Sequence, residues 1–187
     1  MKMEDRWLTP NRWSRPQRQL IGTRGIVVHW VANPNTSALA NRNYFESRKA
    51  GLRGFGSSHE IIGLKGEIIR CVPESEMAYH VGAKRYTKQA LDNLSTYPND
   101  CTYGIELCHV DWDGRMTRQT LLALLERLAV LCDRWQLDPL KDLYLHQEIV
   151  GWKDCPRWWV EHPEDWQAFK GLVKAKMEKG ETSFEFE

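Results

Sequence analysis

Two residues of types that bind zinc lie close together in the last third of the chain. His146 and Cys155 are nine positions apart, Lys153 lies two positions before the cysteine, and Pro156 follows it. Imidazole and thiolate are both common zinc ligands, and a catalytic zinc site typically has three protein ligands and a fourth position open to water or substrate. This stretch can therefore supply two ligands, and a third must come from elsewhere.

The third ligand predicted from the sequence is His29. It follows the apolar run at residues 25–28, whose β-branched members are typical of a strand buried on both faces. Open α/β sheets bind their ligands beyond the carboxyl ends of the strands, and His29 and Trp30 lie at that end of the run. The rest of the chain is then the scaffold that brings His29 to His146 and Cys155.

More strands are predicted on either side of this run in the sequence. Residues 59–64 and 67–72 predict two strands joined by a short turn. Residues 104–108 predict another strand, in which Glu106 points away from the face that carries its apolar neighbours. A short strand at residues 143–145 leads into His146.

Three helices complete the prediction. Thr36 is expected to cap a helix that runs to about Lys49, with Gly51 as its stop. Thr117 is expected to cap the clearest helix, residues 118–135, whose leucines recur at helical spacing. A last helix begins near Pro163, which suits a first helical position. Together these elements predict an α/β fold: a single domain with a central mixed sheet flanked by helices, and a zinc site at the carboxyl ends of strands.

Two irregular segments separate the predicted elements. Residues 51–58 are rich in glycine but lack the spacing of a phosphate-binding or dinucleotide-binding motif, so they predict a flexible loop. Residues 74–103 predict a long loop that contains His80. Long loops in compact domains are often functional, so His80 is a candidate for the site.

The size and charge of the chain exclude several classes of protein. Its 187 residues suit one domain, and a formal net charge of +1 gives no electrostatic reason to bind nucleic acid or an anionic membrane. No apolar run approaches the length of a transmembrane helix, and the N-terminus lacks the apolar segment of a secretory signal. We therefore expect a protein made in the cytoplasm, of a type that binds neither nucleic acid nor membranes.

The same patterns divide the chain into three parts. Residues 25–177 form the predicted catalytic domain, and residues 178–187 form a charged tail or linker. Residues 1–24 are polar and interrupted by proline, so we expect an irregular arm that packs on the domain through Trp7, Trp13 and Leu20.

Cysteine and tryptophan are informative by their number and setting. The five cysteines are an odd number in a chain without a secretory signal, which argues against a disulfide framework. Cys71, Cys108 and Cys132 lie within apolar patterns and predict small buried side chains, whereas Cys155 lies among charged residues. The nine tryptophans belong either to the core or to a groove for a flat or sugar-like ligand, and composition leaves both readings open.

Five short motifs occur in one order between about Gly25 and Trp159. They are a strand that ends in His, a hairpin that begins with His, a His-Val-Gly loop, Gly-Ile-Glu-Leu, and His followed after eight residues by Cys-Pro. This order resembles the zinc-dependent N-acetylmuramoyl-L-alanine amidases of the type-2 amidase and peptidoglycan-recognition-protein superfamily, most of all phage or prophage endolysin amidase domains. The resemblance implies one Zn²⁺ per chain, held by His29, His146 and Cys155.

The resemblance also implies roles for residues that do not bind the metal. Glu106 matches a glutamate on a central strand and would be the general base. Lys153 matches a polar group two positions before the cysteine and would stabilise the oxyanion. The expected substrate-binding residues are His80, Trp30, Trp152 and His59, and His109 is expected at the surface.

Two positions depart from the family pattern. Many members carry a tyrosine just before the hairpin histidine, where this chain has Ser58, and this places the catalytic work on Glu106. Members often have a polar residue after the first ligand, where this chain has Trp30, which leaves the substrate preference open.

The implied reaction is hydrolysis of the amide between N-acetylmuramic acid and L-alanine in bacterial peptidoglycan, with the protein reaching the wall after release at host lysis. Three alternatives are a non-catalytic peptidoglycan-binding module, an intracellular amidase that recycles wall fragments, and a cysteine hydrolase with Cys155 as nucleophile and His146 as base. The presence of Cys155 favours an enzyme over the binding module, which typically lacks that ligand. Pro156 disfavours the cysteine hydrolase, because it removes an N–H that an oxyanion hole would use.

Overall fold

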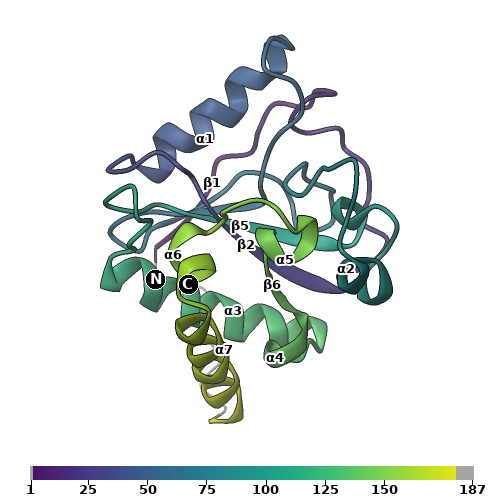
Figure 1. The fold of residues 1–187 in the computed structure, drawn as a ribbon. Coiled ribbons are helices and arrows are strands. Elements are labelled where there is room, and N and C mark those ends of the chain that lie inside the picture. Colours follow the sequence, from purple (N-terminus) through teal and green to yellow (C-terminus); the bar gives the residue numbers. More distant parts are fainter. Residues whose placement is uncertain (1, 180–187) are drawn as a thin grey trace.

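The protein is built around a mixed β-sheet with helices on both faces (Figure 1). The computed structural model describes residues 2–179, and within them six strands follow the order β1-β4-β3-β5-β2-β6. Strands β3 and β4 pair antiparallel, and every other neighbouring pair is parallel. The predicted fold class is confirmed. The strands are β1 (Met3–Asp5), β2 (Gly25–Trp30), β3 (Glu60–Ile62), β4 (Ile68–Arg70), β5 (Thr102–Leu107) and β6 (Leu143–Leu145).

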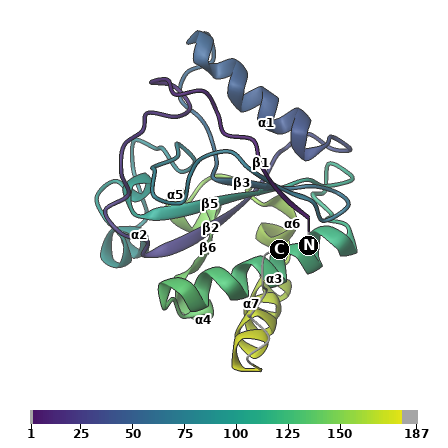
Figure 2. The ribbon, with the colours of Figure 1, turned by 180° about the vertical axis from the view of Figure 1, so that it is seen from behind.

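Helices α3, α4 and α7 lie on one side of the sheet and helix α1 lies on the other, as two opposite views show (Figures 1 and 2). The short helices α2 and α5 lie near the strand ends and contact each other. The helices are α1 (Ala38–Ser47), α2 (Lys88–Asn93), α3 (Arg118–Trp135), α4 (Pro139–Asp142), α5 (His146–Val150), α6 (Arg157–Glu161) and α7 (Pro163–Glu178), with 3-10 turns η1 (Arg48–Ala50) and η2 (Pro98–Asp100).

Helix α3 follows directly from its sequence. The Thr117 hydroxyl accepts a hydrogen bond from the backbone N–H of Thr120, which satisfies one of the free donors of the first turn. Its leucines at helical spacing face the sheet, and Leu124 and Leu128 are fully buried there. Burial of each such side chain stabilises the fold by about 1.5–3 kcal/mol. The helix ends at Gln136, whose left-handed backbone (φ 55°) closes the last turn.

The strands alternate between the two faces as predicted for residues 104–108. On β5, Ile105 and Leu107 join the apolar core beneath α3, and Glu106 points to the opposite face. On β2, Val28 joins the same core, and His29 points to the same face as Glu106. The face beneath α3 is thus closed by a mainly apolar core that also contains the buried Glu60–Arg127 pair, and the other face carries the polar side chains of the site.

The N-terminal segment differs from its prediction. Residues 1–24 were expected to be irregular, but Met3–Asp5 forms strand β1, which pairs in parallel with β4 at the sheet edge. The fully buried anchor of this segment is Leu8, whereas the predicted anchors Trp7, Trp13 and Leu20 are half-buried. The prediction missed β1 because Met3–Asp5, one apolar residue followed by two acids, is too short to show the alternation that marks a strand.

The predicted long loop at residues 74–103 is also more ordered than expected. It contains α2 and η2, and Thr87 caps α2 by accepting a hydrogen bond from the N–H of Ala90. Helix α1 is capped by Ser37 and not by the predicted Thr36, whose hydroxyl instead donates to the carbonyl of Asn33. The predicted stop at Gly51 is confirmed, because its φ of 80° is left-handed.

Other predictions concern the cysteines and the termini. All five cysteines are free and buried, as expected for Cys71, Cys108 and Cys132. Helix α7 extends to Glu178, so most of the predicted tail lies outside the described residues. Within residues 2–179 the structure contains no helix of the length and apolarity that crossing a membrane requires.

Candidate metal centre

The three predicted ligands meet at one point of the sheet. His29 lies at the carboxyl end of β2, and His146 follows the adjacent parallel strand β6 as the first residue of α5. Cys155 returns to the same place on the loop between α5 and α6, where its carbonyl accepts a hydrogen bond from the N–H of Gln147. The chain reverses after α5 at Gly151, which has the positive φ of 83° that glycine adopts without strain.

The ligand atoms lie within 4.8 Å of one another. The Nδ1 atoms of His29 and His146 are 2.9 Å apart, and the Sγ of Cys155 is 3.7 Å from Nδ1 of His29. All three side chains are at most 4% exposed. Three donors that converge in a buried space match the ligand number of a catalytic zinc site.

Burial also sets the protonation states that a metal requires. It lowers the pKa of His146 to about 3, and it lowers the pKa of His29 well below its usual range with added repulsion from His146. Both imidazoles are therefore neutral and keep a lone pair for a metal. Burial raises the pKa of the Cys155 thiol, with a further contribution from Glu106, so the thiol ionises only beside a strong cation. Two neutral imidazoles and a buried thiol fit a zinc ion.

Glu106 stands next to this centre on strand β5. It is paired in register with His29 across β2 and β5, it is partly buried, and no described residue donates a hydrogen bond to its Oε2. Burial raises its pKa to about 8, against the nearby ammonium of Lys153, which lowers it. A carboxyl group with a pKa close to neutral can both accept and release a proton, as a general acid–base must.

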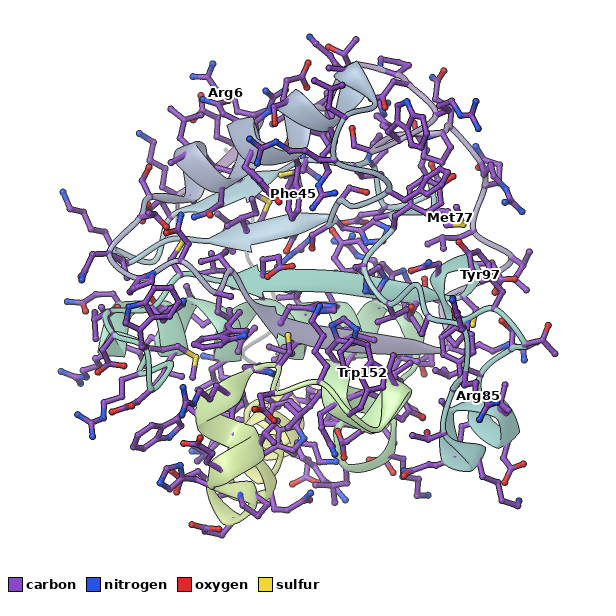
Figure 3. All side chains as sticks on the ribbon, turned by 45° about the horizontal axis from the view of Figure 1, so that its top comes forward. Arg6, Phe45, Met77, Arg85, Tyr97 and Trp152 are labelled. Atoms are coloured by element: carbon purple, nitrogen blue, oxygen red, sulfur yellow. The ribbon has the colours of Figure 1, made fainter. Side chains whose placement is uncertain are left out.

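These groups open into a groove of about 930 Å³. Besides the three candidate ligands, its walls include Glu106, the exposed Lys153 and the predicted substrate residues Trp30, Trp152 and His80. Trp152 is 72% exposed, so one ring face is free for a ligand. Figure 3 shows Trp152 and Phe45, both of which line the groove, on opposite sides of the central strands.

His59, also predicted to bind substrate, is outside the groove. It is fully buried; its Nε2 bonds the carbonyl of Glu76 and its Nδ1 accepts the N–H of Gly104. The ring also stacks on Tyr103 at 4.2 Å. The two ring nitrogens therefore join His59 to β5 and to the segment after β4, and the structure gives His59 a structural position.

The two departures from the family pattern have different surroundings. Ser58 is fully buried and donates its hydroxyl to the carbonyl of Gly104, so it does not border the groove, whereas Ser57 does. Trp30 borders the groove and packs against His109 at 4.6 Å. His109 was expected at the surface, and this expectation is wrong: its Nε2 accepts the N–H of Asn33 and the side chain is buried.

Sequence reasoning missed the wall of the groove formed by the glycine-rich segment at residues 51–58. The guanidinium of Arg48 donates to the carbonyls of Arg53, Gly54 and Phe55, so this loop is held to the end of α1. Phe55 then packs between Trp13 and Tyr79. The signals available within this segment were only Arg53 and Phe55, and its glycine content suggested a flexible loop.

The buried thiol argues against a cysteine nucleophile. The contact of Cys155 Sγ is with His29 and not with the predicted base His146, and the thiol is 2% exposed. Its pKa is raised by burial, whereas reactive cysteines have lowered pKa values and some exposure. The site instead has the composition of a metal centre with an adjacent carboxyl group.

Fold and site together define a class: an α/β domain with a candidate His-His-Cys metal centre at the carboxyl ends of parallel strands, beside a glutamate whose pKa is raised. Residues 17–158 match the Amidase_2 family of N-acetylmuramoyl-L-alanine amidases. This match spans most of the chain, and the protein belongs to that family.

Curated relatives agree with the family match. The chain is 30% identical over 177 residues to the N-acetylmuramoyl-L-alanine amidase BlyA of Bacillus subtilis, and 30% identical over 173 residues to the N-acetylmuramoyl-L-alanine amidase CwlL of Bacillus licheniformis. These alignments cover 91% and 92% of this chain but 46% and 47% of the relatives. The chain therefore spans about half the length of the curated relatives it matches.

Solved structures show the same fold. The catalytic domain of XlyA superposes with a TM-score of 0.70 at 20% identity, covering 92% of this chain and 99% of that one. The catalytic domain of PlyG superposes with a TM-score of 0.73 at 18% identity, covering 95% and 96%. PlyL superposes with a TM-score of 0.72 at 19% identity, covering 92% and 97%.

Proposed function

We propose that this protein is a zinc-dependent N-acetylmuramoyl-L-alanine amidase that hydrolyses the amide between N-acetylmuramic acid and L-alanine in bacterial peptidoglycan. The observation that carries the proposal is the convergence of three buried ligand atoms within 4.8 Å, beside a carboxyl group with an unpartnered oxygen, in a chain of this family. Cleavage of this bond separates the peptide from the glycan strand and weakens the wall.

His29, His146 and Cys155 would hold one Zn²⁺ per chain through two imidazole nitrogens and a thiolate. When bound, zinc lowers the pKa of a water molecule to about 7 and polarises a carbonyl oxygen. The two neutral imidazoles and the single thiolate leave a net charge near +1 at such a site. That residual positive charge would preserve the activation that zinc supplies and that hydrolysis of an unactivated amide requires.

Glu106 is the residue that moves the proton. Its carboxylate takes a proton from the attacking water, and the resulting acid delivers that proton to the leaving nitrogen. Its position favours both steps, because the pKa of about 8 that burial gives it lies near neutral pH. General acid–base catalysis of this kind contributes about 10²–10⁴-fold to the rate.

Lys153 is the candidate for oxyanion stabilisation. Its ammonium group borders the groove and acts electrostatically on Glu106 and on both histidine ligands. A fixed cation at this place opposes the negative charge that develops on the carbonyl oxygen in the transition state. Because the side chain is exposed in the described structure, bound substrate must order it.

The walls of the groove suit a ligand with sugar rings and carboxylates. Among its charged lining residues Glu106 is the only acid, whereas Arg18, Arg53 and Lys84 are cations without a salt bridge among the described residues. The exposed ring of Trp152 offers a flat face for a sugar or a peptide. A muramyl peptide combines both features, since its stem peptide carries free carboxylates.

The two remaining alternatives, a binding module and a recycling amidase, differ from this proposal in different ways. A binding module without catalysis has no need of a buried carboxyl group left without a partner, which is costly unless it serves a reaction. An amidase that recycles wall fragments would use the same chemistry on soluble muramyl peptides. The structural relatives include a protein described as a mutant endolysin from Bacillus subtilis, which favours action on intact wall after release at host lysis.

The test measures zinc content and peptide release together. We expect one zinc per chain, release of peptide amino termini from intact peptidoglycan, and loss of that activity on chelation with recovery on zinc addition. Equal rates on intact wall and on soluble muramyl peptides would favour recycling over lysis. Zinc without cleavage of either substrate would contradict the enzyme, and activity without zinc that thiol alkylation abolishes would restore the cysteine hydrolase.

A further inference from the structure

We propose that His80 is a positioning residue that fixes the tautomer of His29, so that the Nδ1 lone pair of His29 faces the other two ligands. This inference rests on the proposed metal site, and it gives His80 a role other than substrate contact. It is carried by a chain of hydrogen bonds that runs from Thr102 through His80 to His29.

The proton on His80 is assigned by its neighbours. The Nε2 of His80 lies 3.2 Å from both the carbonyl oxygen and the hydroxyl oxygen of Thr102. The carbonyl can only accept, and the hydroxyl proton is already donated to the carbonyl of Pro98 at 2.6 Å. Nε2 of His80 must therefore carry the proton, and its Nδ1 is left as an acceptor.

The tautomer of His29 follows from that of His80. Nδ1 of His80 lies 3.0 Å from Nε2 of His29, so Nε2 of His29 is the donor of this bond. Nδ1 of His29 then has no proton and points at Nδ1 of His146 (2.9 Å) and Sγ of Cys155 (3.7 Å). His29 is thus held with its free lone pair directed at the centre of the ligand set.

His80 itself has little freedom to move. Its backbone N–H and that of Val81 both donate to Oδ1 of Asn99, at 3.0 and 2.9 Å. Its ring lies against Gly104, where an added Cβ would come within 2.6 Å of the ring. Both the orientation of the loop and the absence of a side chain at position 104 therefore serve to seat this imidazole, which is 7% exposed.

The tautomer of His146 follows from that of His29. The two Nδ1 atoms at 2.9 Å must share one proton, and because His29 carries its proton on Nε2, the proton belongs to His146. In the metal-free protein His146 therefore donates from Nδ1 to His29. Metal loading requires His146 to move its proton to Nε2, whereas His29 keeps the same tautomer.

The direct test reads the tautomers by ¹⁵N NMR of histidine-labelled protein, with and without one equivalent of zinc. We expect His29 to be protonated at Nε2 in both states, and His146 to change from Nδ1–H to Nε2–H on loading. A proton on Nδ1 of His29 in the metal-free protein would overturn the proposal. This measurement uses the wild-type chain and needs no catalytic activity.

A second test measures zinc affinity by competition with a chromophoric chelator. His80→Leu removes the acceptor behind His29, and loss of such a partner weakens metal binding by about 10–100-fold. His80→Asn keeps an amide oxygen near the position of Nδ1, so we expect it to recover part of that loss. Equal affinity of wild type and His80→Leu would overturn the inference, whereas absence of zinc binding in wild type would instead contradict the proposed function.

Discussion

Glu60 and Glu106 lie on the adjacent strands β3 and β5 and face opposite sides of the sheet. Glu60 is fully buried on the side of α3, where Arg127 donates to it from Nε at 2.9 and 3.0 Å. Glu106 faces the groove, and its Oε2 has no hydrogen-bond donor among the described residues. Two carboxyl groups in one sheet therefore have opposite surroundings.

Glu60 has the surroundings of a structural charge, whereas Glu106 has those of a group that can react. An ionised group in the interior is costly unless it is paired and hydrogen-bonded, and Glu60 meets that condition through Arg127, which also contacts Glu74 at 2.8 Å. Glu106 is left unpaired, and burial raises its pKa to about 8. One face of the sheet thus gains a fixed ion pair, and the other retains a group that can exchange a proton.

Removal of the Glu106 carboxylate should have the largest effect. Glu106→Gln keeps the shape of the side chain but cannot accept a proton, so we expect the kcat for peptide release to fall by about 10²–10⁴-fold. We expect zinc content and the free energy of unfolding to be unchanged or higher, because an unpaired buried carboxyl group is lost. A fall of less than tenfold would show that another group is the base.

Loss of Arg127 should affect stability instead. Arg127→Ala leaves Glu60 buried without its partner, which typically costs about 3–5 kcal/mol of unfolding free energy, measured by urea denaturation. Catalysis per folded molecule should stay near that of wild type. The control is Arg118→Ala, an exposed residue at the start of the same helix, which should change stability by less than about 0.5 kcal/mol. Equal effects of the two variants would refute the role given to the ion pair.

The contrast between the groove and the rest of the surface can be tested with two tryptophans. Trp152 and Trp112 are 72% and 63% exposed, but only Trp152 lines the groove. Trp152→Ala should raise KM for peptidoglycan about fivefold, equivalent to roughly 1 kcal/mol of aromatic contact. Trp112→Ala should leave KM unchanged. The same change in KM for both variants would mean that Trp152 makes no specific contact with the substrate.

The smallest expected effect concerns the ion pair between Glu74 and Arg134, on the same side of the sheet as Glu60. Burial raises the pKa of Glu74, but hydrogen bonds and charges from Arg127 and Arg134 outweigh burial and lower it. A lowered carboxyl pKa stabilises the fold above the ordinary value of about 4.3 and loses that contribution as the pH falls. Arg134→Ala should therefore cost up to about 1 kcal/mol at pH 7, since the pair is partly exposed, and less at pH 3. A loss that does not shrink with acid would contradict this linkage.

Much of the architecture was predictable from local signals. Capping by Thr117, the leucine spacing of α3, the hairpin of β3 and β4 and the alternation around Glu106 all depend on residues close in sequence. Such signals are set by helix and strand geometry, which a short window of sequence contains. The family motifs predicted the three metal ligands and the role of Glu106. The structure brings these four residues together.

The misplaced residues share a different cause. Backbone groups from distant segments satisfy both ring nitrogens of His59 and the Nε2 of His109, whose Nδ1 bonds the nearby carbonyl of Asp111. No local pattern reveals the distant partners. Strand β1 forms because the edge of β4 accepts it, and not because of its own composition.

The sequence by itself determined which side chains could bind zinc and move a proton, since ligand chemistry and strand alternation are properties of residue type and spacing. Only the tertiary structure decided which ring nitrogen of each histidine carries the proton and in which direction its lone pair points. The chain from Thr102 to His80 to His29 joins residues that are 22 and 51 positions apart. A ring nitrogen becomes donor or acceptor according to the atom opposite it, and that atom is known only once the fold has formed.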